Sequence, residues 1–167
     1  MSEKILHLEI DIDAPVQELW RRWTTKEGIQ SFFAPGCNIE MKPDGPFEIF
    51  FFPENPPGQR GADGQRVMAV EEGKMLSFTW NFPPQLAPIR DQRTIVVLRF
   101  AETKHGSKVT LAQIGWGEGE LWNQGFEYFK HAWETVVLPR LKYSIERGAI
   151  DWSNPPDAET ICAAQNN

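Results

Sequence analysis

The chain has 167 residues, 41% of them hydrophobic and 24% charged, which are ordinary values for one globular domain with a sizeable core. The net charge of −6 argues against a nucleic-acid-binding surface, which would normally be basic. No apolar run approaches the ~20 residues that cross a membrane, so we expect neither nucleic-acid binding nor membrane insertion. Seven Trp and eleven Phe predict an aromatic-rich interior.

The N-terminal segment predicts a strand followed by two short helices. Residues 4–12 alternate apolar and polar side chains, which is typical of a half-buried strand. Asp13-Ala14-Pro15 is a helix-start signal, and Val16 to Trp23 continue with helical spacing. A second helix is expected over residues 25–31, and it should end before Pro35 because the residue before a proline disfavours helix.

Strands dominate the middle of the chain. We expect them at residues 38–41, 47–52, 66–71, 75–80, 94–100 and 108–114. In the second of these, alternation places Phe47, Ile49 and Phe51 on one face, and Glu48, Phe50 and Phe52 on the other. The Gly/Pro-rich stretches 53–64 and 81–92 are predicted loops, and the first could form a flap over a pocket mouth.

Residues 120–147 predict one amphipathic helix, roughly 42 Å long at about 1.5 Å per residue. Its apolar residues recur every three or four positions. Pro139 removes one backbone hydrogen bond, so we expect a kink near Thr135; the alternative is a helix that ends at Leu138 and restarts. Residues 149–167 are expected to be a polar tail, poorly ordered at its end.

This element order predicts an α+β fold. A curved antiparallel sheet of about six or seven strands would wrap around the long C-terminal helix, within a domain at residues 1–148. A space can remain between sheet and helix, and the candidate ligand-binding residues there are Phe32, Phe47, Ile49, Phe51, Phe78, Trp80, Trp116, Trp122, Phe126, Phe129 and Trp133. The alternative is that these side chains fill the interior completely.

Polar side chains beside that space are candidate ligand contacts. Arg93 and Gln113 lie on or beside strands next to the helix, and Asn81 and Glu120 are further candidates. An arginine in an apolar pocket would hold a carboxylate or phenolate through paired hydrogen bonds, whereas the alternative is a solvated arginine at a strand start.

Catalytic and metal motifs are not visible in the sequence. The three histidines, including His131, have no metal-ligand spacing, and we predict His131 to be exposed. No serine lies in a nucleophile-elbow motif, and no Gly-rich nucleotide motif is present, so we expect no cofactor and leave catalysis as the least favoured function. Cys37 and Cys162 form no CxxC motif and no signal peptide is visible, which favours free thiols in a reducing cytoplasm.

Phe50 and Phe52 are predicted to point away from the core. Two Phe on a solvent face would form an exposed apolar patch, which favours a homodimer or a protein partner. The alternative is that the loop 53–64, or the tail with Trp152, covers them.

Five motifs, in order and spacing, resemble one protein family. They are Ile12-Asp13-Ala14-Pro15 with Glu18-Leu19-Trp20, the Thr25 to Pro35 segment with Phe32 in a usual Trp position, Gly45-Pro46-Phe47, Leu76-Ser77-Phe78-Thr79-Trp80, and Gly115-Trp116 followed by Glu146-Arg147-Gly148. Over about residues 5–148 the chain resembles the START-like superfamily, also called SRPBCC or helix-grip domains, and within it the branch of the activator of heat-shock protein 90 ATPase.

The resemblance implies a cavity between the sheet and the long helix. Members of the superfamily bind lipids, sterols, hormones or polyketides, some catalyse cyclisation or hydrolysis, and others act through protein contacts. It therefore implies that an apolar or aromatic small molecule is the ligand. The alternative that it implies is a protein-interaction or chaperone-cofactor role in stress.

Overall fold

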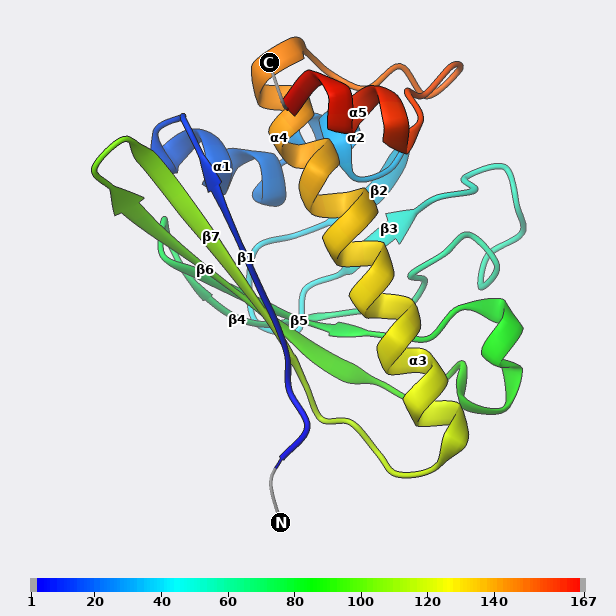
Figure 1. The fold of residues 1–167 in the computed structure, drawn as a ribbon. Coiled ribbons are helices and arrows are strands. Elements are labelled where there is room, and N and C mark those ends of the chain that lie inside the picture. The colour runs from blue at the N-terminus through cyan, green and yellow to red at the C-terminus, as the bar shows by residue number, and fades with distance from the viewer. Residues whose placement is uncertain (1–2, 166–167) are drawn as a thin grey trace.

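The computed structural model describes residues 3–165. Seven strands and a set of helices follow one another along the chain (Figure 1). The strands are β1 Leu6–Ile12, β2 Gly36–Ile39, β3 Phe47–Phe50, β4 Val67–Glu71, β5 Met75–Trp80, β6 Thr94–Thr103 and β7 Gly106–Ile114. The helices are α1 Val16–Thr24, α2 Lys26–Phe32, the 3₁₀ helix η1 Pro84–Ile89, α3 Glu120–His131, the π-helical segment η2 Ala132–Val137, α4 Leu138–Arg147 and α5 Ala158–Gln165.

The strands form two antiparallel pieces, a five-stranded sheet in the order β1-β7-β6-β5-β4 and a two-stranded ribbon of β2 and β3. Single bridges from Pro46 to Arg66 and from Phe50 to Gly61 connect the ribbon to the chain that leads into β4. Gly61 and Gly64 have φ angles of 137° and 78°, so this connecting stretch cannot continue a regular ladder. The predicted α+β helix-grip fold is confirmed, with its curved sheet interrupted at this place.

The long C-terminal helix crosses one face of the sheet without a break from Glu120 to Arg147 (Figure 1). The expected irregularity lies where Pro139 removes a backbone donor, but it takes the form of the π-helical segment η2. There the hydroxyl of Thr135 donates to the carbonyl of His131 at 2.7 Å. The alternative of two separate helices is wrong, because the wider turn absorbs the proline without interrupting the helix.

At the C-terminal end of that helix, a polar network ties three helices together. The guanidinium of Arg22 on α1 donates to the hydroxyls of Ser31 on α2, at 2.8 Å, and Ser144 on α4, at 2.9 Å. It also pairs with Glu18 at 3.0 Å. Both serines are buried, so hydrogen bonds as well as apolar packing hold α1, α2 and α4 together at this end of the fold.

Several boundaries differ from the sequence predictions. β2 begins at Gly36 instead of 38 and β3 ends at Phe50 instead of 52, whereas β6 and β7 extend to a tight turn between 103 and 106. The predicted loop 81–92 contains η1, because its prolines suit a short 3₁₀ turn. The differences at β2, β3 and η1 fall at segments that contain Gly or Pro, where local geometry overrides the strand alternation.

Phe50 does not form part of an exposed patch. Only 8% of its surface is accessible, because the loop 53–64 folds over it and places the Arg60 guanidinium 4.0 Å from the ring centroid. The alternative that this loop covers it is therefore correct for Phe50. Since β3 ends here, Phe51 and Phe52 lie in the bend between the strand and the turn at residues 53–54, and they are 37% and 56% exposed.

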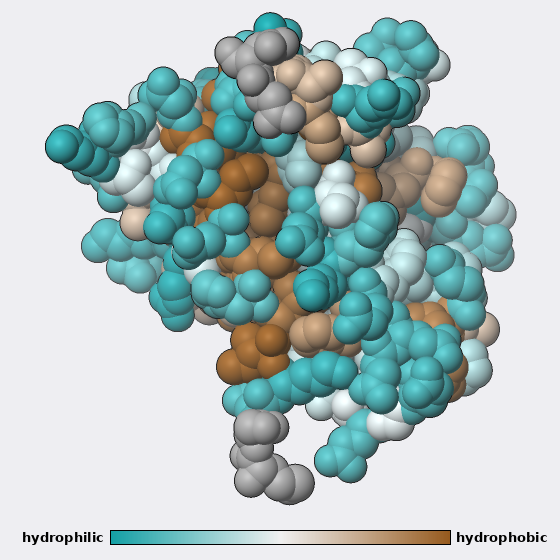
Figure 2. Space-filling model, viewed as in Figure 1, coloured by the Kyte–Doolittle hydropathy of each residue, from teal (hydrophilic) through white to brown (hydrophobic). Residues whose placement is uncertain are grey.

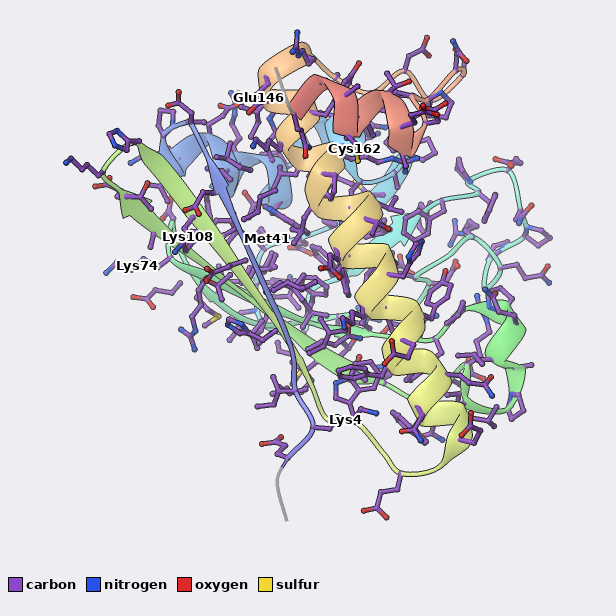
Figure 3. All side chains as sticks on the ribbon, in the orientation of Figure 1. Lys4, Met41, Lys74, Lys108, Glu146 and Cys162 are labelled. Atoms are coloured by element: carbon purple, nitrogen blue, oxygen red, sulfur yellow. The ribbon has the colours of Figure 1, made fainter. Side chains whose placement is uncertain are left out.

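The C-terminal segment folds back onto the long helix. Helix α5, which carries Cys162, packs against α4 with Ile161 buried, and Arg147 donates to the carbonyl of Ala164 at 3.1 Å (Figures 1 and 3). The sequence did not predict this helix, and the predicted disorder at the very end of the tail concerns residues outside those described. Within residues 3–165, no helix is long and apolar enough to span a membrane.

The face of the molecule seen in Figure 2 is mainly hydrophilic, and apolar side chains gather between β1 and the long helix. Leu8 and Ile10 of β1 and Ile145 of α4 are among the partly buried side chains that pack against the core. The cavity described below is lined from the other side of the helix, by the loops after β3 and β5.

Candidate functional site

A cavity of about 400 Å³ lies between the middle of the long helix, the end of β5 and two loops. This volume is in the range of about 300–1,000 Å³ that is usual for small-molecule sites. Its lining residues are Phe33, Phe51, Phe52, Gln59, Gly61, Ala62, Trp80, Asn81, Phe82, Pro83, Pro84, Arg90, Tyr128, Phe129, His131, Ala132, Trp133, Val136, Val137 and Arg140.

One wall is the helix face from Phe129 through Trp133 and Val137 to Arg140. Trp133 is the fixed centre of this wall. Its indole N–H donates to Oε1 of Gln113 at 2.9 Å, and Nε2 of Gln113 donates to the Thr94 hydroxyl at 2.8 Å. Because Gln113 and Thr94 are completely buried, the chain of hydrogen bonds holds the indole in one orientation.

The back of the cavity is formed by three aromatic rings. The ring centroids of Phe33, Trp80 and Trp133 lie 5.6–5.8 Å apart. These distances are ordinary for tilted and edge-to-face aromatic pairs, so the rings support each other while presenting apolar surface to the cavity. A flat or ring-bearing apolar molecule would find stacking partners here.

The mouth is bounded by the exposed rings of Phe51 and Phe52 and by the loop that returns through Gly61. A Cβ atom on Gly61 would lie 2.6 Å from the Phe51 ring, and φ is 137° there, so the site requires glycine. The loop is held by Asp63, which accepts from the N–H groups of Gly58 and Arg60 and pairs with the Arg60 side chain at 2.8 Å.

The hydrogen bonds and the ion pair of Asp63 determine the pKa of its carboxyl group. Burial alone would raise the pKa of Asp63, but the hydrogen bonds from Gly58 and Arg60 outweigh it and hold the pKa below its ordinary value. Asp63 is therefore a stable carboxylate that organises the loop, and it is not among the residues that line the cavity.

Polar groups reach the cavity from several elements. Arg90 donates to the carbonyls of Phe82 at 2.8 Å and Gly61 at 3.4 Å, and Asn81 also donates to Gly61 at 3.3 Å, so these side chains join the two loops. Tyr128 and the exposed His131 lie on the helix at the mouth, and burial raises the pKa of the Tyr128 hydroxyl. Residues 3–165 contain no cluster of side chains that would bind a metal ion.

Five of the predicted candidates line this cavity: Phe51, Trp80, Phe129, Trp133 and the polar candidate Asn81. The structure places others elsewhere in the core. Phe32, Phe47, Ile49 and Phe78 are fully buried, and Phe47 stacks on Phe78 with their centroids 4.0 Å apart. Gln113 is also fully buried; it does not line the cavity, but it holds the indole of Trp133, which does. Arg93 is exposed and donates to the carbonyl of Gly64, so the alternative of a solvated arginine at a strand start is correct.

The remaining predicted residues, Trp116, Trp122 and Phe126, form a separate aromatic cluster around Phe82 at the start of α3. Ring centroids in this cluster are 5.0 Å apart for Phe82 and Trp122 and for Trp116 and Phe126. Lys4 closes it from outside, with its ammonium 4.4 Å from the Phe126 centroid (Figure 3). Trp116, Trp122 and Phe126 fill space with one another instead of bounding the cavity, whereas Phe82 belongs to this cluster and also lines the cavity.

The sequence analysis did not identify several cavity-lining residues that lie in the loops and in the second half of the long helix. Phe33, Arg90 and Arg140 are examples. The position of Arg140 could have been predicted from the sequence, because it follows Val136 and Val137 at helical spacing on the same face of the helix. No local signal indicated Phe33 or Arg90, since their positions depend on how distant segments pack.

Comparison with known proteins agrees with this architecture. A sequence profile described as "Activator of Hsp90 ATPase homolog 1-like protein" matches residues 13–146. A search of curated proteins found no match. Among solved structures, protein MLL2253 from Mesorhizobium loti is similar with a TM-score of 0.69 and 24% identity, covering 88% of this chain and 100% of that one.

Two further structures share the fold at lower identity. CalU16 from Micromonospora echinospora has a TM-score of 0.62 and 21% identity, covering 97% of this chain and 81% of that one. The Aha1 dimer from Colwellia psychrerythraea has a TM-score of 0.59 and 14% identity, covering 87% of this chain and 98% of that one. At these identities the likeness supports the fold alone.

Proposed function

The chain belongs to the Activator of Hsp90 ATPase homolog 1-like family within the START-like superfamily, and from this premise we propose that it is a non-catalytic domain that binds an apolar or aromatic small molecule. The observation that carries the proposal is the cavity of about 400 Å³ beside the long helix. Its size and aromatic lining suit one small ring-bearing molecule.

The packing around the cavity supports this use. Trp133 is held by Gln113, and Phe33 and Trp80 are held by neighbouring rings, so the back of the site is already ordered before a ligand enters. A preorganised wall lowers the entropy cost of binding. The mouth, by contrast, consists of the exposed Phe51 and Phe52, which would lose their contact with water when a ligand covers them.

The test uses the neutral fluorescent probe N-phenylnaphthylamine and a variant that fills the cavity. Val136 lines the cavity and is half-buried, so Val136→Phe should occupy ligand space and weaken probe binding at least tenfold. Val97→Phe is the matched control, because Val97 lies on β6 outside the cavity lining. The control should bind the probe as the unchanged protein does.

Native mass spectrometry of the purified protein provides a second readout, because a retained small molecule would appear as an added mass. The proposal is overturned if the probe does not bind, or if Val136→Phe and Val97→Phe bind it equally. A probe that binds both variants equally would be using some other apolar surface.

A second candidate function is a protein contact, such as a homodimer or a chaperone-cofactor role in stress. The observation that favours it is the exposed Phe52 at the edge of the cavity, together with the dimeric state of the Colwellia relative. Light scattering of the unchanged protein and of Phe52→Ser tests it: a dimer that the substitution dissociates would support this candidate, and a monomer at all concentrations would count against a homodimer. A cytoplasmic location stays a prediction.

A further inference from the structure

The cavity lining carries an unbalanced charge. The chain contains 23 acidic residues and 17 lysines and arginines, but the lining includes Arg90 and Arg140 and no Asp or Glu. His131 lies at the mouth as a further basic group. An acidic protein has therefore placed its cavity in a locally basic environment, which would attract negatively charged molecules to it.

Arg140 differs from the other arginines that are withdrawn from water. Four arginines are half-buried, namely Arg22, Arg60, Arg90 and Arg140. Arg22 pairs with Glu18, Arg60 pairs with Asp63, and Arg90 donates to two backbone carbonyls. Among residues 3–165, no carboxylate lies within 4 Å of the Arg140 guanidinium, and none of the described side-chain hydrogen bonds involves it.

The surroundings of Arg140 compensate its charge only in part. Its guanidinium lies 5.4 Å from the centroid of the Trp152 ring, near the outer limit of about 6 Å for a cation–π contact. Burial lowers the pKa of Arg140, because the charged form loses water without gaining a partner. A partly buried guanidinium normally has hydrogen-bond partners for its five N–H donors. Those of Arg140 are available to a molecule in the cavity.

Resting on the proposed function, we propose that the ligand is an amphipathic organic anion whose carboxylate-like group pairs with Arg140. Its apolar body would lie against Phe33, Trp80 and Trp133 at the back of the cavity. A guanidinium matches a carboxylate with two parallel hydrogen bonds, which fixes the orientation of the bound molecule as well as its charge. The anionic group would supply the partner that the fold leaves out.

The test compares two probes that share one aromatic skeleton. Anilinonaphthalene sulfonate carries an anionic group, and N-phenylnaphthylamine is neutral. Arg140→Gln should weaken binding of the sulfonate about tenfold, as expected for the loss of a charge-assisted hydrogen bond, and change binding of the neutral probe less than about twofold. Arg99→Gln removes the same charge from an exposed position on β6, and it should leave both probes unaffected.

A third variant separates anion binding from an effect on the C-terminal segment. Trp152→Leu removes the aromatic partner of Arg140 and the indole hydrogen bond to the carbonyl of Gln30, but it keeps the guanidinium. It should retain the preference for the sulfonate. Displacement of the bound sulfonate by laurate and by naphthoate then distinguishes a chain-bearing from a ring-bearing anion, and stronger displacement by naphthoate is the result that the aromatic walls predict.

The possible failures are distinguishable. If Arg140→Gln binds both probes as the unchanged protein does, the anion inference is overturned and the proposed function stands. If it weakens both probes equally, or if Trp152→Leu abolishes the preference, Arg140 acts through the shape of the site and the inference is again overturned. If the neutral probe does not bind the unchanged protein, the proposed function itself fails.

Discussion

Two aromatic clusters lie against the same helix and meet at Phe82, which lines the cavity, but the other rings of the first cluster do not border it. At the start of α3, Trp116, Trp122 and Phe126 close around Phe82. Further along, Phe33, Trp80 and Trp133 leave about 400 Å³ beside them. The two groups contain the same kinds of side chain at similar distances from one another, so aromatic content does not determine whether an interior region is filled or open.

The difference lies in what approaches each cluster from outside. Gly125 and Gly117 let the packed cluster close: a Cβ atom on Gly125 would lie 2.4 Å from the Phe82 ring, and one on Gly117 would lie 2.5 Å from Trp122. The open cluster faces the segments 51–62 and 81–90, where Gly and Pro determine the path of the backbone and the side chains line the space without filling it. The backbone of the surrounding loops therefore decides where the cavity lies.

The largest expected effect comes from removing the ring that both the core and the cavity wall depend on. Trp133→Ala should lower the free energy of unfolding by about 3–5 kcal/mol, as for other buried aromatic truncations, and leave Oε1 of Gln113 without its donor. Urea unfolding followed by circular dichroism measures this. Trp133→Phe should lose less, because it keeps most of the packing; equal losses would show that the packing of this ring contributes little.

The packed cluster is tested by a substitution that prevents the close approach between Gly125 and the ring of Phe82. Gly125→Ala should lower the free energy of unfolding by about 1–3 kcal/mol through the clash with Phe82, even though alanine favours helix by about 1 kcal/mol. The exposed neighbour Glu127 provides the control, since Glu127→Ala meets no such contact. A Gly125→Ala protein as stable as the control would mean that this cluster has spare room, and the contrast between the two regions would disappear.

Acid should destabilise the loop at the mouth of the cavity, residues 58–64, before it destabilises α3. The native pKa of Asp63 lies below the value of about 3.9 for an unfolded chain, so its stabilisation is complete above that pH and is lost as the pH falls through the native pKa. The hydrogen-exchange protection factors of residues 58–64, which are corrected for the intrinsic effect of pH, should therefore fall at low pH, while those of α3 stay high. The pKa of Glu18 is also lowered and acts with the same sign on the whole fold, so a local measurement is required.

Asp63→Asn separates these contributions. This substitution should lower the protection factors of residues 58–64 already at neutral pH, and it should remove the further loss of protection in acid. An Asp63→Asn loop that keeps the original acid response would assign that response to other groups.

The smallest effect on stability is expected at the mouth of the cavity. Phe52 is 56% exposed, so Phe52→Ser should change the free energy of unfolding by less than about 0.5 kcal/mol while weakening neutral-probe binding several-fold. Met68 on β4 is similarly exposed at 47% and lies outside the cavity lining, which makes Met68→Ser the matched control. Equal probe affinity in the two variants would remove Phe52 from the site.

The sequence predicted the fold better than the site because the two depend on different kinds of information. The period of Phe129, Trp133 and Val137 identifies one helix face whatever surrounds it. Whether Trp122 packs only against other rings and Trp80 borders a cavity depends on loops that reach them from elsewhere in the chain. The strand alternation failed at Phe50, which is buried beneath the loop 53–64, and β3 ends two residues earlier than the pattern indicated.

The π-helical segment η2 also sets the phase between the two halves of the long helix. A π turn holds about one residue more than an α turn, so the segment takes up one extra residue while Arg140 stays on the cavity face and Ser144 stays beside Arg22. Deleting one residue within 132–136 would let the segment become regular α-helix with both positions kept, whereas deleting one residue between Arg140 and Ser144 would turn Ser144 away from Arg22 by about 100°. The segment is therefore the place where the long helix tolerates a change of length without changing the relative orientation of its two ends.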